Sequence, residues 1–187
     1  MIDVYPPPEL HLLLGVVNYL YNAIEKEWAG VSCWAELCNI QHQAYHGGSF
    51  DGNSCRKLLK NVDKLRSICP IQILKFVKAL YDFEKVVTSC FGADLHFPSF
   101  MGYLDDFKKS YTDLQIPVTP KVHCVFFHVK EFCLKHQKPL GRYSEQSLEA
   151  VHNDFKSTWE KYKVSEEHPH FGTALLRAVH EYNSKHV

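Results

Sequence analysis

Hydrophobic and polar positions alternate with the period of an α-helix along almost the whole chain. The clearest case follows the three prolines at 6–8, where apolar side chains occupy two faces and leave a narrow polar stripe. One face holds Leu10, Leu13, Leu14, Val17, Leu20, Tyr21, Ile24 and Trp28; the other holds Leu12, Val16, Tyr19 and Ala23; the stripe holds His11, Gly15, Asn18, Asn22 and Glu25. Because a helix that is apolar on two sides must be covered on both, we expect this helix at the centre of the fold.

Seven further helices are predicted, over residues 32–46, 55–66, 70–91, 98–114, 120–136, 144–162 and 169–184. Their start signals are N-cap or first-turn residues: Ser32, Asn53 or Ser54, Pro70, Thr119 with Pro120, and Ser144. The segment KVHCVFFHV (121–129) has a composition that would suit a strand, but the Thr-Pro start and the continued 3.6 periodicity favour a helix. The pattern therefore predicts an all-α fold of about seven to eight helices. We expect two regions, 1–140 and 141–187, packed as one compact unit.

Composition narrows the class of protein. The 187 residues are 45% hydrophobic and 22% charged, and their formal net charge is zero, so bulk charge does not favour nucleic-acid binding. The seven cysteines form no C-x-x-C pair, and the first residues do not resemble a signal peptide. The longest apolar runs are far too short to cross a bilayer. We therefore expect an intracellular protein with reduced thiols that is neither secreted nor membrane-spanning.

One predicted helix carries a row of polar side chains beside its apolar stripe. Glu145, Glu149, His152 and Lys156 follow one another at helical spacing. Carboxylates four residues apart lie roughly 5–6 Å from each other at Cβ, and two of them can share Mg²⁺. The alternative is a solvated flank, since glutamates in a first turn are favoured by the helix dipole. On spacing alone the solvated flank is favoured.

Twelve histidines raise the question of a zinc site. His123 and His128 are five residues apart, which places them about 140° apart around a helix, so we do not expect them to share a metal. Cys124 and His128 have the spacing i, i+4 and could share one, although a buried thiol beside a boundary histidine is favoured. The pair His42 and His46 has the same spacing, with an exposed helix face as its alternative.

Two other polar groups are candidates for function. His11 begins the polar stripe of the first helix, and it is either a histidine beside a metal site or part of an internal hydrogen-bond network. Arg56, Lys57 and Lys60 belong to a short basic helix that could contact phosphate, with a solvated surface as the alternative.

Several long segments resemble a known group of sequences. They are PPPELHLLLGVVNYLYNAI, YHGGSFDGNSCRKLLKNVDKL, TPKVHCVFFHVKEFC, LGRYSEQSLEAVHNDFKSTWEKYKV and LLRAVHEYNSKH. Together they are similar to the C-terminal part of a family of transposon-derived proteins found in invertebrate genomes. More distantly, the chain resembles cut-and-paste transposases with a ribonuclease-H-like (DDE-type) core.

This resemblance implies roles for individual residues. His11 with the segment 14–17 resembles the motif that opens the helical insertion of these transposases, so region 1–140 would be insertion-like. Lys121, His123 and His128 resemble a later motif, and Glu149 with His152 resembles the segment that carries the third metal-binding carboxylate. By the resemblance, Glu149 is the candidate catalytic residue with Glu145 as its alternative, and Glu149, His152 and His11 are the candidate metal residues.

The chain departs from the transposase pattern in two places. Pro8 stands where the aspartate before the first histidine is usual, and the strands that would carry the other two acids are missing. Two-metal phosphoryl chemistry needs several converging carboxylates, so we expect this chain to lack nuclease activity by itself. The hypotheses are a transposase-like fragment whose full-length relative would cleave and join DNA with Mg²⁺ in the nucleus, and a free-standing helical module that binds a protein partner or a second copy of itself.

Overall fold

The computed structural model describes residues 6–41, 49–143 and 154–186. Within these ranges every regular element is helical and no strand occurs, so the prediction of an all-α fold is confirmed. The chain divides into two compact units, unit 1 (Met1–Ser144) and unit 2 (Glu145–Val187).

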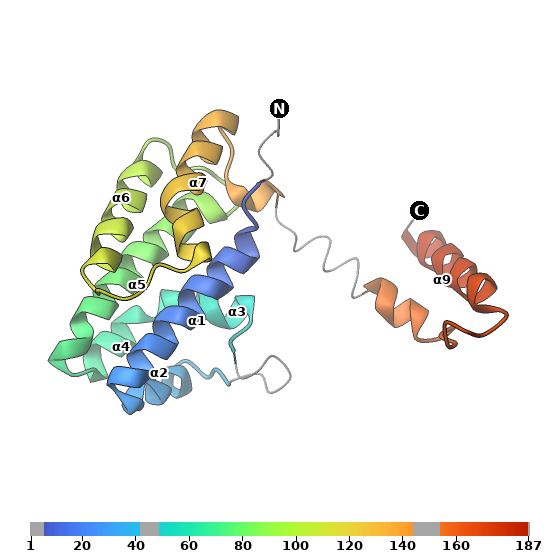
Figure 1. Ribbon diagram of the computed structural model, residues 1–187, viewed down its shortest axis with the longest axis horizontal. Helices are drawn as coiled ribbons and strands as arrows, with labels where there is room; N and C mark the ends of the chain where they lie inside the picture. The colour runs from blue at the N-terminus through green and yellow to red at the C-terminus, as the bar shows by residue number, and fades with distance from the viewer. Residues whose placement is uncertain (1–5, 42–48, 144–153, 187) are drawn as a thin grey trace. The chain divides into compact units, whose positions relative to one another are not determined.

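The described residues of unit 1 form a bundle of seven α-helices. They are α1 (Glu9–Glu27), α2 (Ser32–Leu37), α3 (Gly52–Lys60), α4 (Val62–Ile68), α5 (Leu74–Val86), α6 (Ser99–Thr112) and α7 (Pro120–His136). Among the same described residues, the 3-10 turns η1 (Ala29–Val31) and η3 (Ile71–Ile73) lie between helices, and η5 (Leu140–Tyr143) follows α7. A π-helical turn, η4 (Val87–Phe91), extends α5. In Figure 1, α5, α6 and α7 lie side by side, while α2, α3 and α4 form a second group.

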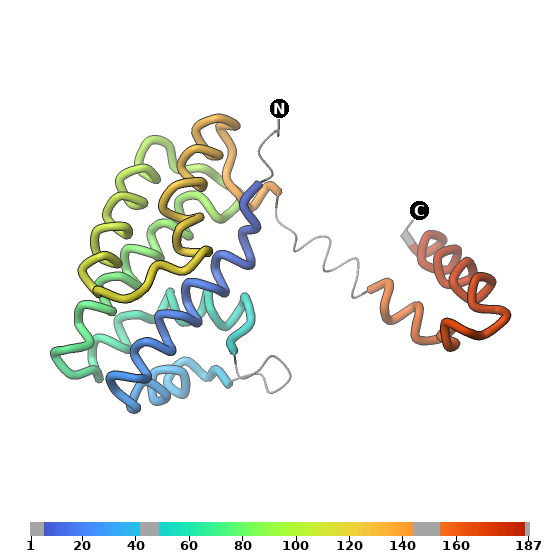
Figure 2. The backbone as a smooth tube through the Cα atoms, in the orientation of Figure 1, coloured from blue at the N-terminus to red at the C-terminus, as the bar shows by residue number. Residues whose placement is uncertain are grey.

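Helix α1 is central to unit 1, as its two apolar faces predict. It packs against α3, α5 and α7, and its path past both groups of helices can be followed in Figure 2. Its buried apolar side chains are Leu10, Leu12, Leu13, Val16, Val17, Leu20, Tyr21 and Ile24. Full burial of one such side chain stabilises the fold by about 1.5–3 kcal/mol, so the side chains of α1 contribute a large part of the stability of the core.

Helices α1 and α7 approach each other closely at Gly15. A Cβ atom at this position would lie 2.0 Å from Cδ of Lys121, so the alkyl chain of Lys121 lies directly on the glycine. This contact joins two segments that are more than 100 residues apart in the chain.

Aromatic side chains fill the other half of the core. Phe107 on α6 is central to this group, with ring centroids 4.9 Å from Phe83 on α5 and 5.7 Å from Phe126 on α7. Tyr111 packs edge-on against both Phe107 and Phe126. Tilted and edge-to-face arrangements of this kind add to the free energy of area burial. They hold α5, α6 and α7 together.

The second predicted helix is shorter than expected. The pattern indicates a helix over 32–46, whereas α2 ends at Leu37. Asn39 adopts a left-handed conformation (φ 51°), and the N–H groups of Asn39 and Ile40 donate to the carbonyls of Glu36 (2.8 Å) and Ala35 (3.0 Å). This pair of hydrogen bonds is a Schellman motif, which satisfies the last carbonyls and stops the helix. Residues 42–48, with His42 and His46, lie outside the described residues.

The basic helix also differs from its prediction. Its N-cap is Asp51, whose carboxylate accepts a hydrogen bond of 2.7 Å from the backbone N–H of Ser54, and neither Asn53 nor Ser54 is the cap. The helix then breaks at Asn61, where α3 ends and α4 begins. The backbone carbonyl of Asn61 accepts a hydrogen bond of 3.0 Å from the indole N–H of buried Trp34. The break therefore coincides with a tertiary contact, which the helical periodicity of the sequence cannot predict.

Helix α7 begins as predicted. The Thr119 hydroxyl accepts a hydrogen bond of 3.3 Å from the backbone N–H of Val122, and Pro120 occupies the first helical position. The helix ends at Gln137, which is left-handed (φ 52°). The choice of helix over strand for KVHCVFFHV is confirmed.

Unit 2 is small. Residues 154–159 are helical, and α9 (Phe171–His186) follows after a turn. Two edge-to-face pairs join these helices: Trp159 with Phe171 at 5.8 Å, and Phe155 with Tyr182 at 5.6 Å between ring centroids. Residues 144–153 lie outside the described part of the chain.

Candidate functional site

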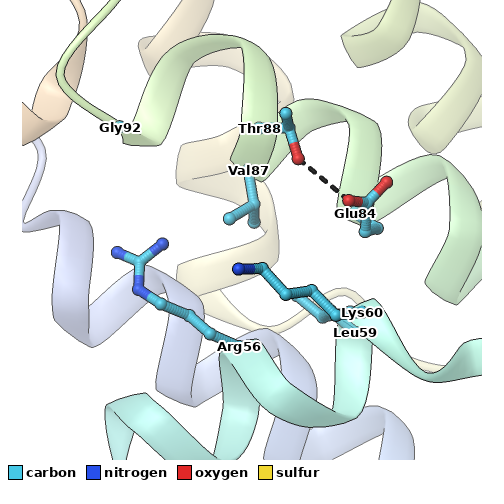
Figure 3. A pocket seen from close by; sticks show the side chains of 7 residues that line it. All are labelled: Arg56, Leu59, Lys60, Glu84, Val87, Thr88 and Gly92. Carbon is cyan, nitrogen blue, oxygen red and sulfur yellow. Dashed lines mark hydrogen bonds between the residues drawn. The ribbon is translucent and has the colours of Figure 1, made fainter.

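A pocket of about 230 Å³ lies in unit 1 between α3 and the end of α5. Arg56, Leu59 and Lys60 line it from α3, and Glu84, Val87, Thr88 and Gly92 line it from α5, η4 and the residue after η4. Figure 3 shows these side chains around the opening, with the cationic groups on one wall and Glu84 and Thr88 on the other. We call this cavity the α3–α5 pocket.

The sequence of α3 places three side chains on the pocket wall. Arg56, Leu59 and Lys60 have the spacing i, i+3, i+4, so they occupy one face of the helix. The Asp51 cap begins the helix and sets their direction. Leu58 and Leu59 are buried, which fixes α3 against the core.

Arg56 is held by a buried carboxylate. Its guanidinium forms a hydrogen-bonded ion pair with Glu9 in the first turn of α1, whose side chain is only 1% exposed, whereas that of Arg56 is 30% exposed. A buried carboxylate needs such a partner, and removing one member of a buried pair costs about 3–5 kcal/mol. The guanidinium has five N–H donors, so it can hold Glu9 and still present donors to the pocket.

Lys60 is the most available cation of the pocket. Its side chain is exposed, and Figure 3 shows its ammonium extending between the two walls. Among the residues that the structure describes, no carboxylate lies within ion-pairing distance of this ammonium. A lysine ammonium is a compact charge with three donors, so it is suited to an anionic group of a ligand.

The opposite wall is a π-helical turn. The Thr88 hydroxyl lies 2.9 Å from a carboxylate oxygen of Glu84, to which it donates a hydrogen bond. Cys90 and Phe91 anchor the same turn in the core, where the Cys133 thiol and burial raise the pKa of Cys90. Single-turn π-helices occur often at functional sites.

The remaining predicted basic residue has a structural role. The ammonium of Lys57 lies 3.4 Å from the carbonyl of Asn39, and the ammonium of Lys64 on α4 lies 2.9 Å from the carbonyl of Leu37. Both cations therefore stabilise the C-terminal end of α2, where the helix dipole is negative. The three residues predicted to contact phosphate are thus divided: Arg56 and Lys60 line the pocket and Lys57 does not.

The polar stripe of α1 contains one residue that organises unit 1. The Asn18 amide accepts from the backbone N–H of Phe50 (2.7 Å) and donates to the carbonyl of Phe50 (3.2 Å). It also donates to the Leu14 carbonyl and to the Cys55 thiol. Asn18 thereby ties the start of α3 to α1, while His11 is exposed on the same helix.

The acidic face predicted for the Ser144 helix lies outside the described residues. The candidate catalytic and Mg²⁺-binding residues Glu145 and Glu149, with His152, are in the range 144–153. Within the described ranges, no group of three or more His, Cys, Asp or Glu side chains is placed to hold a metal ion.

His123 and His128 are closer than their spacing indicates. Their ring centroids are 5.5 Å apart, although the two positions lie about 140° apart around the helix. This distance does not test the expectation that they do not share a metal. Five residues rise about 7.5 Å along a helix. The rings come closer together than this rise because the two side chains extend toward each other along the helix.

No pattern in the sequence identifies Glu84, Thr88 and Gly92 as site residues. Glu84 and Thr88 have ordinary helical spacing, and the π-helical turn that contains Thr88 has no distinctive sequence signal. They join the pocket only because α3 packs against α5.

Comparisons with known proteins found no matching family model, no matching curated protein and no matching solved structure. Of the helices in the described ranges, none combines the length and apolar character needed to cross a membrane.

Proposed function

We propose that unit 1 is a helical nucleic-acid-binding module that holds a backbone phosphate in the α3–α5 pocket. The observation that carries this proposal is the Lys60 ammonium, exposed beside Arg56 at the pocket and without a carboxylate partner among the described residues. Phosphate contacts from lysine and arginine are the main source of affinity in protein–nucleic acid complexes.

The walls of the pocket suit a sugar–phosphate unit. Lys60 supplies a point charge and Arg56 supplies planar donors, while the apolar side chains of Leu59 and Val87 can contact sugar carbons. Glu84 on the far wall repels a second phosphate. The pocket therefore accommodates one phosphate rather than a continuous run of them.

The resemblance to transposon-derived proteins makes DNA the expected nucleic acid and the nucleus the expected location. Strand cleavage with Mg²⁺ is not part of this proposal for the chain by itself, because Glu145, Glu149 and His152 lie outside the described residues. Since the net charge of the chain is zero, we expect local rather than general attraction to DNA.

The test is binding of a short labelled DNA duplex, followed by fluorescence anisotropy at several salt concentrations. Replacing the exposed Lys60 by glutamine removes one phosphate contact, so we expect about three- to tenfold weaker binding and a salt slope that is smaller by about 1. Lys109→Gln is the matched control, because Lys109 is exposed on α6 and does not line the pocket. Equal affinities for the Lys60 and Lys109 variants would refute the proposed site.

A second candidate is the free-standing helical module that binds a protein. The observation that favours it is the continuous core of unit 1, which includes buried residues from all seven of its α-helices. Absence of DNA binding by the unaltered chain would leave this candidate in place of the first.

A further inference from the structure

We propose that His123 and His128 on α7 form a binding site for a divalent transition metal of the zinc class. This inference is independent of the proposed phosphate pocket, which is built from other helices. It rests on the approach of two exposed imidazole rings, whose centroids are 5.5 Å apart and whose planes are inclined by 61°.

The separation of the rings fits a shared metal ion. Zinc binds imidazole nitrogen at about 2.0–2.1 Å with tetrahedral angles, so two bound rings have their centres roughly 5–6 Å apart. The observed centroid distance falls in this range before any metal is added. We infer that rotation of the two side chains directs one nitrogen of each ring at a common point.

A neighbouring ring restricts one of the two histidines. The ring of Phe127 lies 4.7 Å from that of His123, and the ammonium of Lys108 on α6 lies 4.1 Å from the centre of the Phe127 ring. The packing limits the rotamers of His123 and reduces the entropy lost on metal binding. The positive charge of Lys108 lowers the affinity of the histidine pair for a metal cation. We therefore expect weaker metal binding than in sites with three or four protein ligands.

The proposed ion would keep open positions. With His123 and His128 as its protein ligands, the remaining coordination positions are left to water or to a donor from another molecule. Imidazole nitrogen is a good ligand for zinc, copper, nickel and iron, so the site is selective for this class over Mg²⁺ or Ca²⁺.

A second histidine pair provides a comparison within the same chain. His168 and His170 have ring centroids 5.6 Å apart in unit 2. However, Nδ1 of His168 already accepts a hydrogen bond of 3.2 Å from the backbone N–H of His170. One of the two ring nitrogens of His168 is thus engaged, and we assign no site to this pair.

The experiment is a calorimetric titration of the full chain with Zn²⁺ in a buffer that does not bind metals. His123→Gln and His128→Gln are each expected to weaken one binding step about tenfold or more. His96→Gln and His168→Gln are matched controls, because both side chains are exposed and neither belongs to the α7 pair; both are expected to leave that step unchanged. All four substitutions are on the surface, so the fold is expected to persist, and circular dichroism verifies this.

Three outcomes would overturn the inference. One is an isotherm that neither α7 variant changes. Another is an equal loss in the His96 variant, which would indicate non-specific binding to surface histidines. The third is a loss confined to the His168 variant, which would place the site in unit 2.

Discussion

Units 1 and 2 are both helical, but they differ in how completely their apolar side chains are buried. In unit 1 the apolar faces of the helices meet in one core, where Leu13, Val16, Phe83 and many others are fully buried. In the described part of unit 2, Ala178 is the only fully covered apolar side chain, and Leu176 on α9 is 71% exposed. Helical periodicity is therefore sufficient to form helices in both units but not to enclose a core in both.

The two units differ in apolar burial because their helices have different numbers of neighbouring helices. A central helix such as α1 is contacted by α3, α5 and α7, so both of its apolar faces lose water. In unit 2, aromatic pairs join α9 to a single described partner helix, residues 154–159. A pair of helices buries one stripe on each member and leaves the remaining apolar side chains to solvent.

The largest expected contrast comes from removing one large apolar side chain from each unit. Phe83→Ala leaves a cavity in the aromatic core and is expected to lower the free energy of unfolding by about 3–5 kcal/mol. Leu176→Ala removes an exposed side chain and is expected to change it by about 0.5 kcal/mol or less. Urea denaturation followed by circular dichroism measures both. Comparable losses would show that Leu176 is covered in solution and would break the contrast between the units.

A pair of glycines provides a smaller test. A Cβ atom on Gly141 would lie 2.2 Å from the carbonyl oxygen of Gly92, whereas a Cβ atom on Gly172 in α9 meets nothing within 4 Å. Gly141→Ala therefore forces backbone apart, and we expect a loss of about 1–3 kcal/mol. Gly172→Ala adds helix propensity and is expected to be neutral or slightly stabilising. The same denaturation experiment distinguishes them, and a neutral Gly141 variant would contradict the close contact between η4 and η5.

The smallest expected effect concerns charge in unit 2. Hydrogen bonds from Lys161 (2.8 Å), Lys185 (2.6 Å) and Tyr162 (2.5 Å) lower the pKa of Glu181 to about 2. A carboxyl whose pKa falls on folding stabilises the folded state above its ordinary pKa of about 4.5, and this contribution is lost as the pH falls toward 2. Because Glu181 lies at the surface, where solvent screens ion pairs, we expect only a small decline in the helicity of unit 2 across this range.

Nuclear magnetic resonance of the Glu181 side chain measures its titration directly. In the double variant Lys161→Gln, Lys185→Gln the two strongest causes are removed, so the pKa should rise toward its ordinary value. An unchanged titration in the double variant would show that these ion pairs do not persist in solution. The contrast between the units would then rest on apolar burial alone.

How much of the α3–α5 pocket follows from the sequence can be judged from its two walls. Arg56 and Lys60 are recognisable beforehand, because a short basic helix with i, i+4 spacing indicates a shared face. Glu84 and Thr88 have no comparable signal, since their contribution depends on which helix packs against α3. The spacing of His123 and His128 likewise does not indicate the 5.5 Å between their ring centroids, because side-chain conformation sets that distance.

The sequence by itself determined the helical class, the central place of α1 and the start of α7 at Thr119. These features depend on local periodicity and local capping, which adjacent residues encode. The tertiary structure alone decided the break at Asn61, the burial of Glu9 against Arg56 and the hydrogen bonds between the Asn18 amide and the backbone of Phe50. Each of these joins residues far apart in the chain, so its free energy exists only once the helices pack.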